Sequence, residues 1–285
     1  MILSQQFENE IDRIINNAFR EDLGSGDHTS LSCIPKSASG KAALLVKDTG
    51  IIAGVDFAKK AFKFIDKGLE IETFISDGCI VNNGDVVFIV SGNSQSILQS
   101  ERIILNVMQR MSAIATKTSF FVDLLKGTKT KILDTRKTTP GIRALEKWAV
   151  SIGGGVNHRF GLYDMIMIKD NHIDFAGGIS QAITKTKKYL RDKKLELKII
   201  VEARNLNEIK EIIQNEGVHR ILIDNFSFKD TRAAVNLING KCLTESSGGI
   251  NEKTIRKYAE CGVDFISSGA LTHSIHNMDL SLKAI

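Results

Sequence analysis

The chain has 285 residues, long enough for one large domain or two ordinary domains that need no disulfide or metal to be stable. Its 38 basic and 33 acidic residues are spread along the whole sequence, and the aromatic residues do not alternate with the cations, which excludes a concentrated nucleic-acid-binding stripe. The modest net charge of +5 favours small anionic ligands instead.

The cysteines and the N-terminal segment indicate a cytoplasmic protein. Cys33, Cys79, Cys242 and Cys261 form no CxxC pair and have no histidine at metal-ligand spacing, which is typical of reduced thiols. The N-terminal segment carries charges within an amphipathic helical pattern, unlike a signal peptide. No stretch approaches the roughly 18 uncharged apolar residues of a membrane span. We therefore expect no membrane partner and no nucleic-acid partner.

The sequence up to about residue 92 predicts a sheet packed on helices. Apolar residues recur at three- and four-residue intervals over residues 7–19, which predicts a helix that ends at the polar turn EDLGSGDHTS. Short strands are expected in SGKAALLVKD and IIAGV, and a helix in FAKKAFKFI. Two further strands are expected in LEIETFISDG and DVVFIVSG, around the turn NNGD.

A long helical pattern follows over residues 94–125, and we expect Ser112 and Ala113 to mark a break between two helices. Beyond it, apolar strand segments alternate with helical segments such as NLNEIKEIIQNEG and NEKTIRKYAECG. The strand segments are KILDT, MIMIKD, KIIVEA, RILIDN, CLTESS and FISSGA. This alternation predicts βα units and a parallel sheet that is buried on both faces.

The last four strand segments end at polar residues, at intervals of 22, 21 and 23 residues: Glu202, Asp224, Glu245 and Ser268. Each interval fits one strand, one helix and two short loops. An open doubly wound sheet is the alternative, but such a sheet gathers its site at one switch point. Polar residues at four consecutive strand ends favour a (β/α) barrel with the site on that edge.

The stretch 134–172 concentrates cationic side chains beside glycines and strand ends. They are Arg136, Lys137, Arg143, His158, Arg159, Lys169 and His172, with Pro140 and the glycine run 153–155 among them. A solvated basic face is the plain alternative. Cations at strand ends are instead typical of anion-binding groups, with arginine suited to carboxylates and lysine to phosphate.

Three alternatives stay open for these cations. Lys169 ends an apolar strand, so a Schiff-base lysine is the rival chemistry. His158 and His172 either orient or donate to a ligand, or are structural hydrogen-bonding histidines. A non-catalytic anion-binding protein would carry the same cations without any reaction.

The carboxylates Glu202, Asp224 and Glu245 occupy corresponding positions of neighbouring strands. Their plain interpretation is capping of the helices that follow. Acids at three successive strand ends exceed what capping requires. This favours binding of Mg²⁺ or sugar hydroxyls, or stabilisation of positive charge in a transition state.

Two turns of small residues follow the last strands: Ser247-Gly248-Gly249 and Ser268-Gly269-Ala270. Small residues let backbone N–H groups approach a phosphate at a helix N-terminus. Thr272 and His273 come next and add donors, unless His273 faces solvent.

These motifs together carry a family resemblance. In chain order they are EDLGSGDHTS, ERIILNVMQRMSAIAT, DTRKTTPGIRALEKWAVSIGGGVNHRFGLYDMIMIKDNHI, VEARNLNE, ILIDN, ESSGGI and ISSGALTHS, and they span nearly the whole chain. The sequence resembles the quinolinate phosphoribosyltransferase family. The resemblance implies an α/β fold in which an N-terminal α/β sandwich domain precedes an incomplete (β/α) barrel with a parallel sheet. It also implies that phosphoribosyl pyrophosphate and quinolinate react, with Mg²⁺, to give nicotinate mononucleotide, pyrophosphate and CO₂ in de novo NAD biosynthesis.

The resemblance also assigns substrate contacts on this chain. They fall to Arg102, Thr135, Arg136, Lys137, His158, Arg159, Lys169, Glu202, Asp224, Ser247, Gly248, Gly249, Ser268, Gly269, Ala270 and His273. Quinolinate carboxylates are expected among Arg136, His158, Arg159 and Lys169, with Lys137 between quinolinate and the phosphoribosyl donor. The ribose hydroxyls and Mg²⁺, the metal partly through substrate, are expected at Glu202 and Asp224. The two small-residue turns and His273 are expected to bind the 5-phosphate, and the catalytic residues are Lys137, Lys169, Glu202 and Asp224.

The resemblance further implies domain limits and an assembly. The N-terminal domain is expected over residues 1–105, with the tail 274–285 packed back on it, and the barrel domain over residues 106–273. Arg102 matches an arginine that reaches the partner subunit's site, which implies a homodimer with shared active sites, or a hexamer built from such dimers. Arg204 in VEARN and Ser246 in ESSGG depart from the family pattern beside functional positions. A related family associated with molybdenum transport shares the architecture but does not usually keep a KDNH segment.

Overall fold

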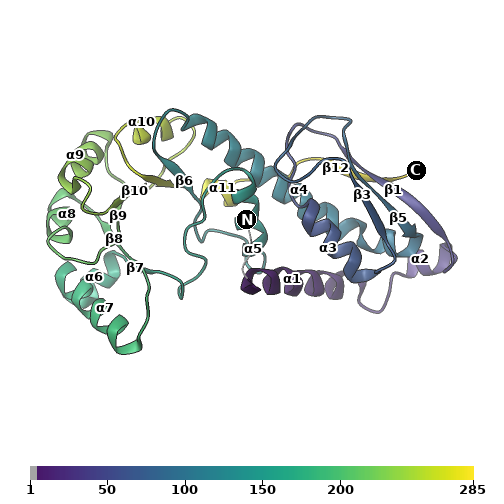
Figure 1. Cartoon of the computed structure of the whole chain (residues 1–285), viewed down its shortest axis with the longest axis horizontal. Helices are drawn as coiled ribbons and strands as arrows, with labels where there is room; N and C mark the ends of the chain where they lie inside the picture. Colours follow the sequence, from purple (N-terminus) through teal and green to yellow (C-terminus); the bar gives the residue numbers. More distant parts are fainter. Residues whose placement is uncertain (1–4) are drawn as a thin grey trace. The chain divides into compact units, whose positions relative to one another are not determined.

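The computed structural model describes residues 5–285, which divide into two compact units. The first unit contains residues 5–119, 138–154 and 271–285, and the second contains residues 120–137 and 155–270. The chain therefore passes from the first unit to the second and back twice (Figure 1). The expected domain limits at residues 105 and 273 stay a prediction. No helix among residues 5–285 has both the length and the apolar character that crossing a bilayer requires.

The first unit is a small antiparallel sheet with helices beside it (Figure 1). Its elements are α1 (Gln5–Leu23), α2 (His28–Cys33), β1 (Ser39–Val46), β2 (Gly50–Ile51), α3 (Val55–Ile65), β3 (Glu70–Thr73), β4 (Ile80–Val81), β5 (Val86–Asn93), α4 (Ser94–Leu124), α5 (Arg143–Ile152), α11 (Ala270–His273) and β12 (Leu280–Ala284). Helices α4 and α11 each continue across the boundary into the second unit.

The main sheet of this unit has the order β12-β1-β5-β3. Its antiparallel register pairs Leu44 with Phe88 of β5 and with Leu282 of β12, so the C-terminal tail supplies an edge strand. Phe88 is fully buried, and its ring makes an edge-to-face contact with Phe62 of α3 at 5.9 Å between centroids. This aromatic contact joins the sheet to the helix in one apolar core.

The expected break at Ser112 and Ala113 is wrong, because α4 runs unbroken over Ser94–Leu124. Ser112 is fully buried, and its hydroxyl accepts a hydrogen bond from Ala53 N (2.9 Å) and donates one to Ala53 O (3.2 Å). The hydroxyl is thus satisfied by a neighbouring segment and does not compete for the helix's own backbone groups. Alanine is a strong helix former and gives no reason for a break.

The second unit is a parallel sheet with helices on its outer side. Its elements are β6 (Lys131–Leu133), β7 (Ile166–Ile168), α6 (Asp170–Ala176), α7 (Ile179–Lys193), β8 (Ile199–Ala203), α8 (Leu206–Ile212), β9 (Arg220–Asp224), α9 (Phe228–Ile238), β10 (Leu243–Ser247), α10 (Ile255–Ala259) and β11 (Phe265–Ser267). All five strand pairings in this sheet are parallel. Each of the six predicted strand segments therefore forms a strand.

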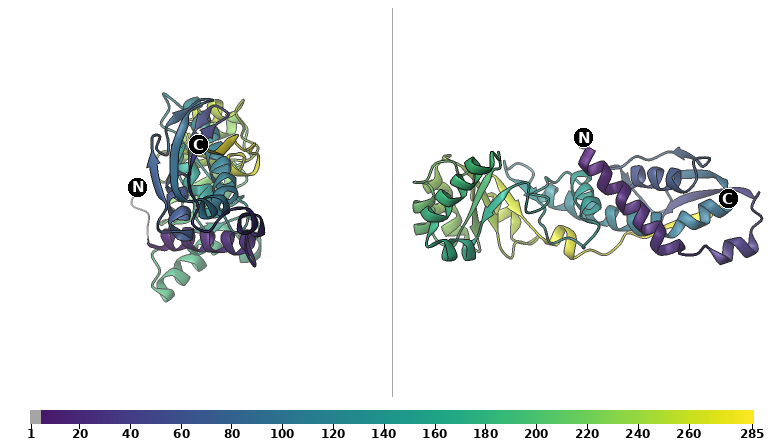
Figure 2. Two further views of the ribbon diagram at one scale, coloured as in Figure 1. Left: turned by 90° about the vertical axis from the view of Figure 1, so that its right-hand side faces the viewer. Right: turned by 90° about the horizontal axis from the view of Figure 1, so that it is seen from below.

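The strand order, β6-β11-β10-β9-β8-β7, is the chain order of a barrel that is open between β6 and β7. Within the opening, Val156 forms an isolated parallel bridge with Leu133 of β6. Helices α8, α9 and α10 lie outside the strands, and the view from below shows the same layering (Figures 1 and 2). The structure confirms the α/β class and the incomplete barrel, and it excludes the doubly wound alternative.

The glycine run of the predicted site stretch has a packing role in the first unit. Gly153 is buried at the end of α5, and a Cβ placed there would lie 2.4 Å from Ala115 O and 2.8 Å from Thr118 Cβ of α4. Both neighbours belong to the helix and have little freedom to move, so a side chain would force α4 and α5 apart.

We predict that Gly153→Ala lowers the free energy of unfolding by about 1–3 kcal/mol through this overpacking, measured by urea unfolding. Gly68→Ala is the matched control, because its Cβ would meet only the flexible carboxylate of Asp66, at 3.1 Å. Equal losses of stability in the two variants would contradict close packing at Gly153.

Candidate active site

The carboxyl edge of the parallel sheet in the second unit gathers most of the predicted site residues. The chain leaves β6 into Asp134, Thr135, Arg136 and Lys137, leaves β7 into Lys169, and leaves β10 and β11 into the two small-residue turns. Parallel strands end at the same edge, so the sheet topology alone brings these segments together. Arg102, on α4, and His273, at the end of α11, are exposed residues of the first unit.

The three strand carboxylates do not lie at one level. Glu202 of β8 and Glu245 of β10 are both in register with Leu222 of β9. Asp224 is level with Ser247 and lies two residues nearer the carboxyl edge. The expectation of corresponding positions is therefore corrected. Glu245 lies within the sheet and is fully buried, whereas Asp224 reaches the edge and is only partly buried.

Glu202 pairs with a cation from the neighbouring strand. Its Oε2 lies 3.2 Å from Nζ of Lys169, which follows β7. Burial raises the pKa of Glu202, and the negative charges of Asp224 and Asp170 raise it further, whereas Lys169 opposes the shift. Burial disfavours the charged form of this carboxylate, so a ligand that brings positive charge or hydroxyl donors would stabilise it.

Helix capping does not account for the acids of β8 and β9. Asn205 caps α8 by accepting from the N–H groups of Asn207 and Glu208, and Ser227 caps α9. Asp224 instead accepts hydrogen bonds from Ser247 Oγ (2.6 Å) and Asn225 Nδ2 (2.7 Å). The side chains of Glu202 and Asp224 thus contact other groups of the same edge.

The first small-residue turn requires its glycines. Gly248 and Gly249 have φ values of +96° and +60°, a backbone region that other residues rarely adopt. A Cβ on Gly248 would lie 2.1 Å from Asn225 Oδ1. Ser268 Oγ donates to Ile250 O at 3.3 Å and so connects the second turn to the first. The two turns are therefore one connected and tightly packed piece of the edge.

Two guanidinium groups interact at the opening of the barrel. Burial lowers the pKa of Arg159, and the positive charge of Arg136 lowers it further, while Asp164 opposes the shift. Arg159 is half-buried and donates from Nη1 to Met165 O at 3.2 Å. Two like charges that repel each other in the free protein form a site for an anion, which would remove the repulsion.

The rings of His158 and His172 make hydrogen bonds or close contacts with other residues of the chain. His158 has a side chain only 6% exposed, with Nδ1 accepting from Arg159 N (2.6 Å) and Nε2 lying 3.3 Å from Glu245 Oε2. His172 Nδ1 accepts from Lys169 N at 3.0 Å, at the start of α6. The structural interpretation of both rings therefore agrees with their contacts. His273 is exposed, and its Nδ1 lies 2.7 Å from Ser274 Oγ.

Of the remaining predicted cations, Arg136 and Lys137 are exposed, and the Lys137 N–H donates to Thr135 Oγ1 at 3.0 Å. Arg143 belongs to the first unit, where its Nε donates to Thr138 Oγ1 at 2.9 Å.

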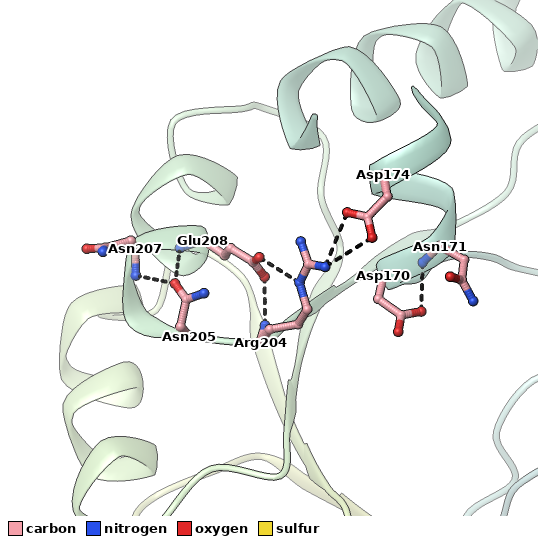
Figure 3. A network of polar contacts seen from close by, with 7 residues as sticks. All are labelled: Asp170, Asn171, Asp174, Arg204, Asn205, Asn207 and Glu208. Carbon is pink, nitrogen blue, oxygen red and sulfur yellow. Dashed lines mark hydrogen bonds and ion pairs between the residues drawn. The ribbon is translucent and has the colours of Figure 1, made fainter. Parts of the chain in front are cut away.

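The unusual Arg204 lies outside the buried part of the edge. Figure 3 shows its guanidinium between Glu208 of α8 and Asp174 of α6, with distances of 2.8 Å and 3.2 Å. The hydrogen bond with Glu208 is the main cause of a raised pKa for Arg204. Arg204 thus joins two helices that follow the strands of Lys169 and Glu202. Ser246 is fully buried in β10.

Two residues of the site were missed in the sequence. Asp134 is fully buried at the end of β6, where it accepts from His158 N (2.8 Å) and Asn157 Nδ2 (2.6 Å). Arg220 begins β9, and its Nη1 donates to Glu245 Oε2 at 2.7 Å. Each is a charged residue in an apolar strand segment, which was the available signal.

The raised pKa of Glu202 gives a stability prediction with a definite sign. A raised folded-state pKa contributes stability below the unfolded-state pKa, and that contribution is lost as pH rises through the folded-state value. The side chain of Glu202→Gln cannot titrate. The melting temperature of this variant should therefore increase relative to that of the native protein as pH rises from about 4.5 to about 7.5. Glu252→Gln, at an exposed position, is the control for thermal unfolding. If the melting temperature of Glu202→Gln instead falls relative to that of the native protein as pH rises, the raised pKa of Glu202 is refuted.

Comparison with known proteins finds matches over nearly the whole chain. Residues 27–112 match the model "Quinolinate phosphoribosyl transferase, N-terminal domain", and residues 114–283 match the C-terminal domain model. The chain is 44% identical to the Arabidopsis thaliana "Nicotinate-nucleotide pyrophosphorylase [carboxylating], chloroplastic", over 96% of this chain and 82% of that protein. It is 41% identical to the Nicotiana glauca "Quinolinate phosphoribosyltransferase [decarboxylating] 2, mitochondrial", with the same coverage.

A solved structure, the nicotinate-nucleotide pyrophosphorylase from Francisella tularensis, is similar with a TM-score of 0.90 and 39% identity. The match covers 97% of this chain and 96% of that one. The chain belongs to the quinolinate phosphoribosyl transferase family.

Proposed function

We propose that the protein transfers the phosphoribosyl group of phosphoribosyl pyrophosphate to quinolinate, with loss of CO₂. The products are nicotinate mononucleotide and pyrophosphate, and the reaction belongs to de novo NAD biosynthesis. Family membership and the names of the relatives support this activity. The observation that carries the proposal is the placement of Arg136 and Lys169 at a strand edge that also holds carboxylates, where Lys169 Nζ lies 3.2 Å from Glu202 Oε2.

The cationic part of the edge suits quinolinate, an aromatic dicarboxylate. Arg136 and Arg159 would bind the two carboxylates, because guanidinium groups match carboxylates in a bidentate geometry. Binding the dianion places negative charge beside both guanidinium groups and relieves their mutual repulsion. Lys169 and Thr135 would complete the contacts, and Lys137 would lie between quinolinate and the phosphoribosyl donor.

The acidic part of the edge suits the sugar. Departure of pyrophosphate builds positive charge on the ribose ring, which Glu202 and Asp224 would stabilise electrostatically while accepting from its hydroxyls. The turns at residues 247–249 and 268–270 would bind the 5-phosphate through backbone N–H groups, with His273 as a further donor. No covalent nucleophile is needed, because orientation and charge placement lower the barrier.

Decarboxylation follows from the same placement. Once the quinolinate nitrogen carries the ribose, the ring is positively charged and stabilises the electron pair that departing CO₂ leaves on the adjacent ring carbon. A proton from solvent then forms the C–H bond of the product at that carbon. The residues of the edge need only hold the ring and release CO₂. Lys169 and Glu202 can retain their ion pair throughout, so no residue has to change its covalent state.

The donor set fits Mg²⁺ when substrate provides part of its coordination. No cluster of three or more metal-binding side chains occurs among residues 5–285, so the protein offers no complete cage. Mg²⁺ is usually held by one or two carboxylates together with substrate phosphates and water, and Glu202 and Asp224 are the carboxylates available. When bound, the ion would neutralise charge on the departing pyrophosphate.

The Schiff-base alternative is disfavoured by the same ion pair. Imine formation needs an amine that is free to attack a carbonyl, whereas the Lys169 amine is paired with the Glu202 carboxylate at 3.2 Å. The Lys169 side chain is also 48% exposed, so it lacks the burial that usually keeps such a lysine neutral.

The assembly is also a proposal. Arg102 is exposed on α4 in the first unit. We propose that it completes the partner subunit's site in a homodimer, which can in turn form part of a hexamer. The cytoplasmic location stays a prediction.

The direct test is incubation of the protein with quinolinate, phosphoribosyl pyrophosphate and Mg²⁺, with CO₂ and nicotinate mononucleotide measured together. We expect both products in equal amounts. Arg159→Met should lose at least about tenfold in kcat/KM for quinolinate, because a charge-assisted pair is lost. Arg256→Met, which breaks an exposed pair with Glu260, is the matched control. Release of neither product by the native protein would refute the function.

Shared sites are tested by mixing inactive subunits. Arg102→Ala and Lys137→Ala should each be inactive alone, because each removes one cation from every site of the dimer. Each heterodimer should regain about half of native activity, since one of its two sites receives both native residues. A randomly exchanged equal mixture should therefore regain about a quarter. Demonstrated heterodimers without any recovery would contradict a contribution of Arg102 to the partner's site.

A further inference from the structure

The second unit contains a buried charge cluster below the proposed substrate site. Arg220 Nη1 donates to Glu245 Oε2 at 2.7 Å, and His158 Nε2 lies 3.3 Å from the same oxygen. Glu245 is fully buried, and Arg220 is 7% exposed with its guanidinium 4.2 Å from the centre of the Phe265 ring. Burying these charges costs free energy that their attraction only partly returns, so stability alone is a weak reason for the cluster.

The cluster keeps Glu245 ionised. Burial raises the pKa of this carboxyl, but the contact with His158, the charge of Arg220 and the Ser267 hydroxyl together hold the pKa below its usual value. A carboxylate accepts hydrogen bonds and donates none. The ring atom of His158 that faces Glu245 must therefore carry a proton.

The second ring nitrogen of His158, Nδ1, binds the backbone of Arg159. Nδ1 accepts the backbone N–H of Arg159 at 2.6 Å, which requires Nδ1 to be without a proton. Glu245 therefore selects the tautomer with the proton on Nε2, and that tautomer binds the Arg159 backbone. The same short segment is held from the other side by Asp134, which accepts from His158 N and Asn157 Nδ2.

The anchored segment lies at the opening of the barrel. It crosses the opening between β6 and β7, where its only β-pairing among the described residues is the Val156 bridge to Leu133. Beyond Arg159 the chain enters the exposed residues Leu162 and Tyr163. The buried carboxylates of Asp134 and Glu245 thus contact the start of the segment that carries Arg159.

We propose that Glu245, whose Oε2 lies 2.7 Å from Nη1 of Arg220, is a positioning residue for quinolinate binding. It sets the tautomer and orientation of His158, which in turn fixes the backbone from which Arg159 reaches the carboxylate. The inference rests on the proposed function for the identity of the ligand. The contact between Glu245 and His158 does not depend on that identity and can be tested without any ligand.

The test compares two double variants that differ in one hydrogen-bond acceptor. Arg220→Met removes the cation and keeps an apolar contact with Phe265, so the remaining carboxylate must also be neutralised. Glu245→Gln keeps an acceptor for Nε2–H, whereas Glu245→Leu has a similar volume and no acceptor. R220M/E245Q and R220M/E245L should both fold, with melting temperatures measured for each.

We expect R220M/E245L to raise KM for quinolinate about tenfold relative to R220M/E245Q, with kcat and the KM for phosphoribosyl pyrophosphate nearly equal in the two. A purely structural cluster would instead change the melting temperature or all kinetic constants together. Equal quinolinate KM values in the two variants would overturn the proposal.

Nitrogen-15 NMR of the histidine rings supplies the readout that needs no substrate. His158, assigned with His158→Leu, should show a protonated Nε2 and a bare Nδ1 in the native protein and in R220M/E245Q, and a mixture of tautomers in R220M/E245L. An unchanged tautomer in R220M/E245L would overturn the proposal. If R220M/E245L does not fold, His158→Leu replaces it and must raise the quinolinate KM by a similar factor. Absence of turnover in the native protein would refute the proposed function, and the NMR comparison would still decide the Glu245–His158 link.

Discussion

A strand buried on both faces of a parallel sheet can keep a charged side chain only where a partner meets it or where the strand ends. In the second unit this constraint governs the whole site. Strand β8 is buried along its full length, and its one acid, Glu202, pairs with Lys169. Strand β10 contains the one fully buried glutamate of the sheet, and that residue pairs with Arg220 and His158. The other residues of the second unit that the proposed site uses lie at or beyond the carboxyl edge.

The same burial also disfavours the charged forms of two groups in the ligand-free site. Burial shifts the pKa of Glu202 upward and that of Arg159 downward, so each group is held partly against its charged form. A dianion beside the arginines and an electron-poor sugar beside the acids would reverse both effects. The proposed reaction brings these two charges together in one transition state, which explains why the cations and the acids occupy different parts of one edge.

Much of the fold could be predicted from the sequence because hydrophobic periodicity reports local structure directly. The strand segments and most helices lie where the pattern placed them, and the polar strand ends predicted the edge that carries the site. Contacts between neighbouring strands, and between segments distant in the sequence, could not be predicted in the same way. The level of Asp224 relative to Glu202 depends on strand register, and the partner of His158 depends on how the chain crosses the barrel opening. The unbroken α4 depends on a hydroxyl contact with Ala53, which no local pattern contains.

The most direct measurement is the crystal structure of the protein with quinolinate bound. We predict the two carboxylates within about 3 Å of the guanidinium groups of Arg136 and Arg159, with the ring nitrogen directed toward Glu202 and Asp224. The His158 ring should remain against Glu245. Quinolinate bound away from both arginines, or with its nitrogen turned from the acids, would contradict the account.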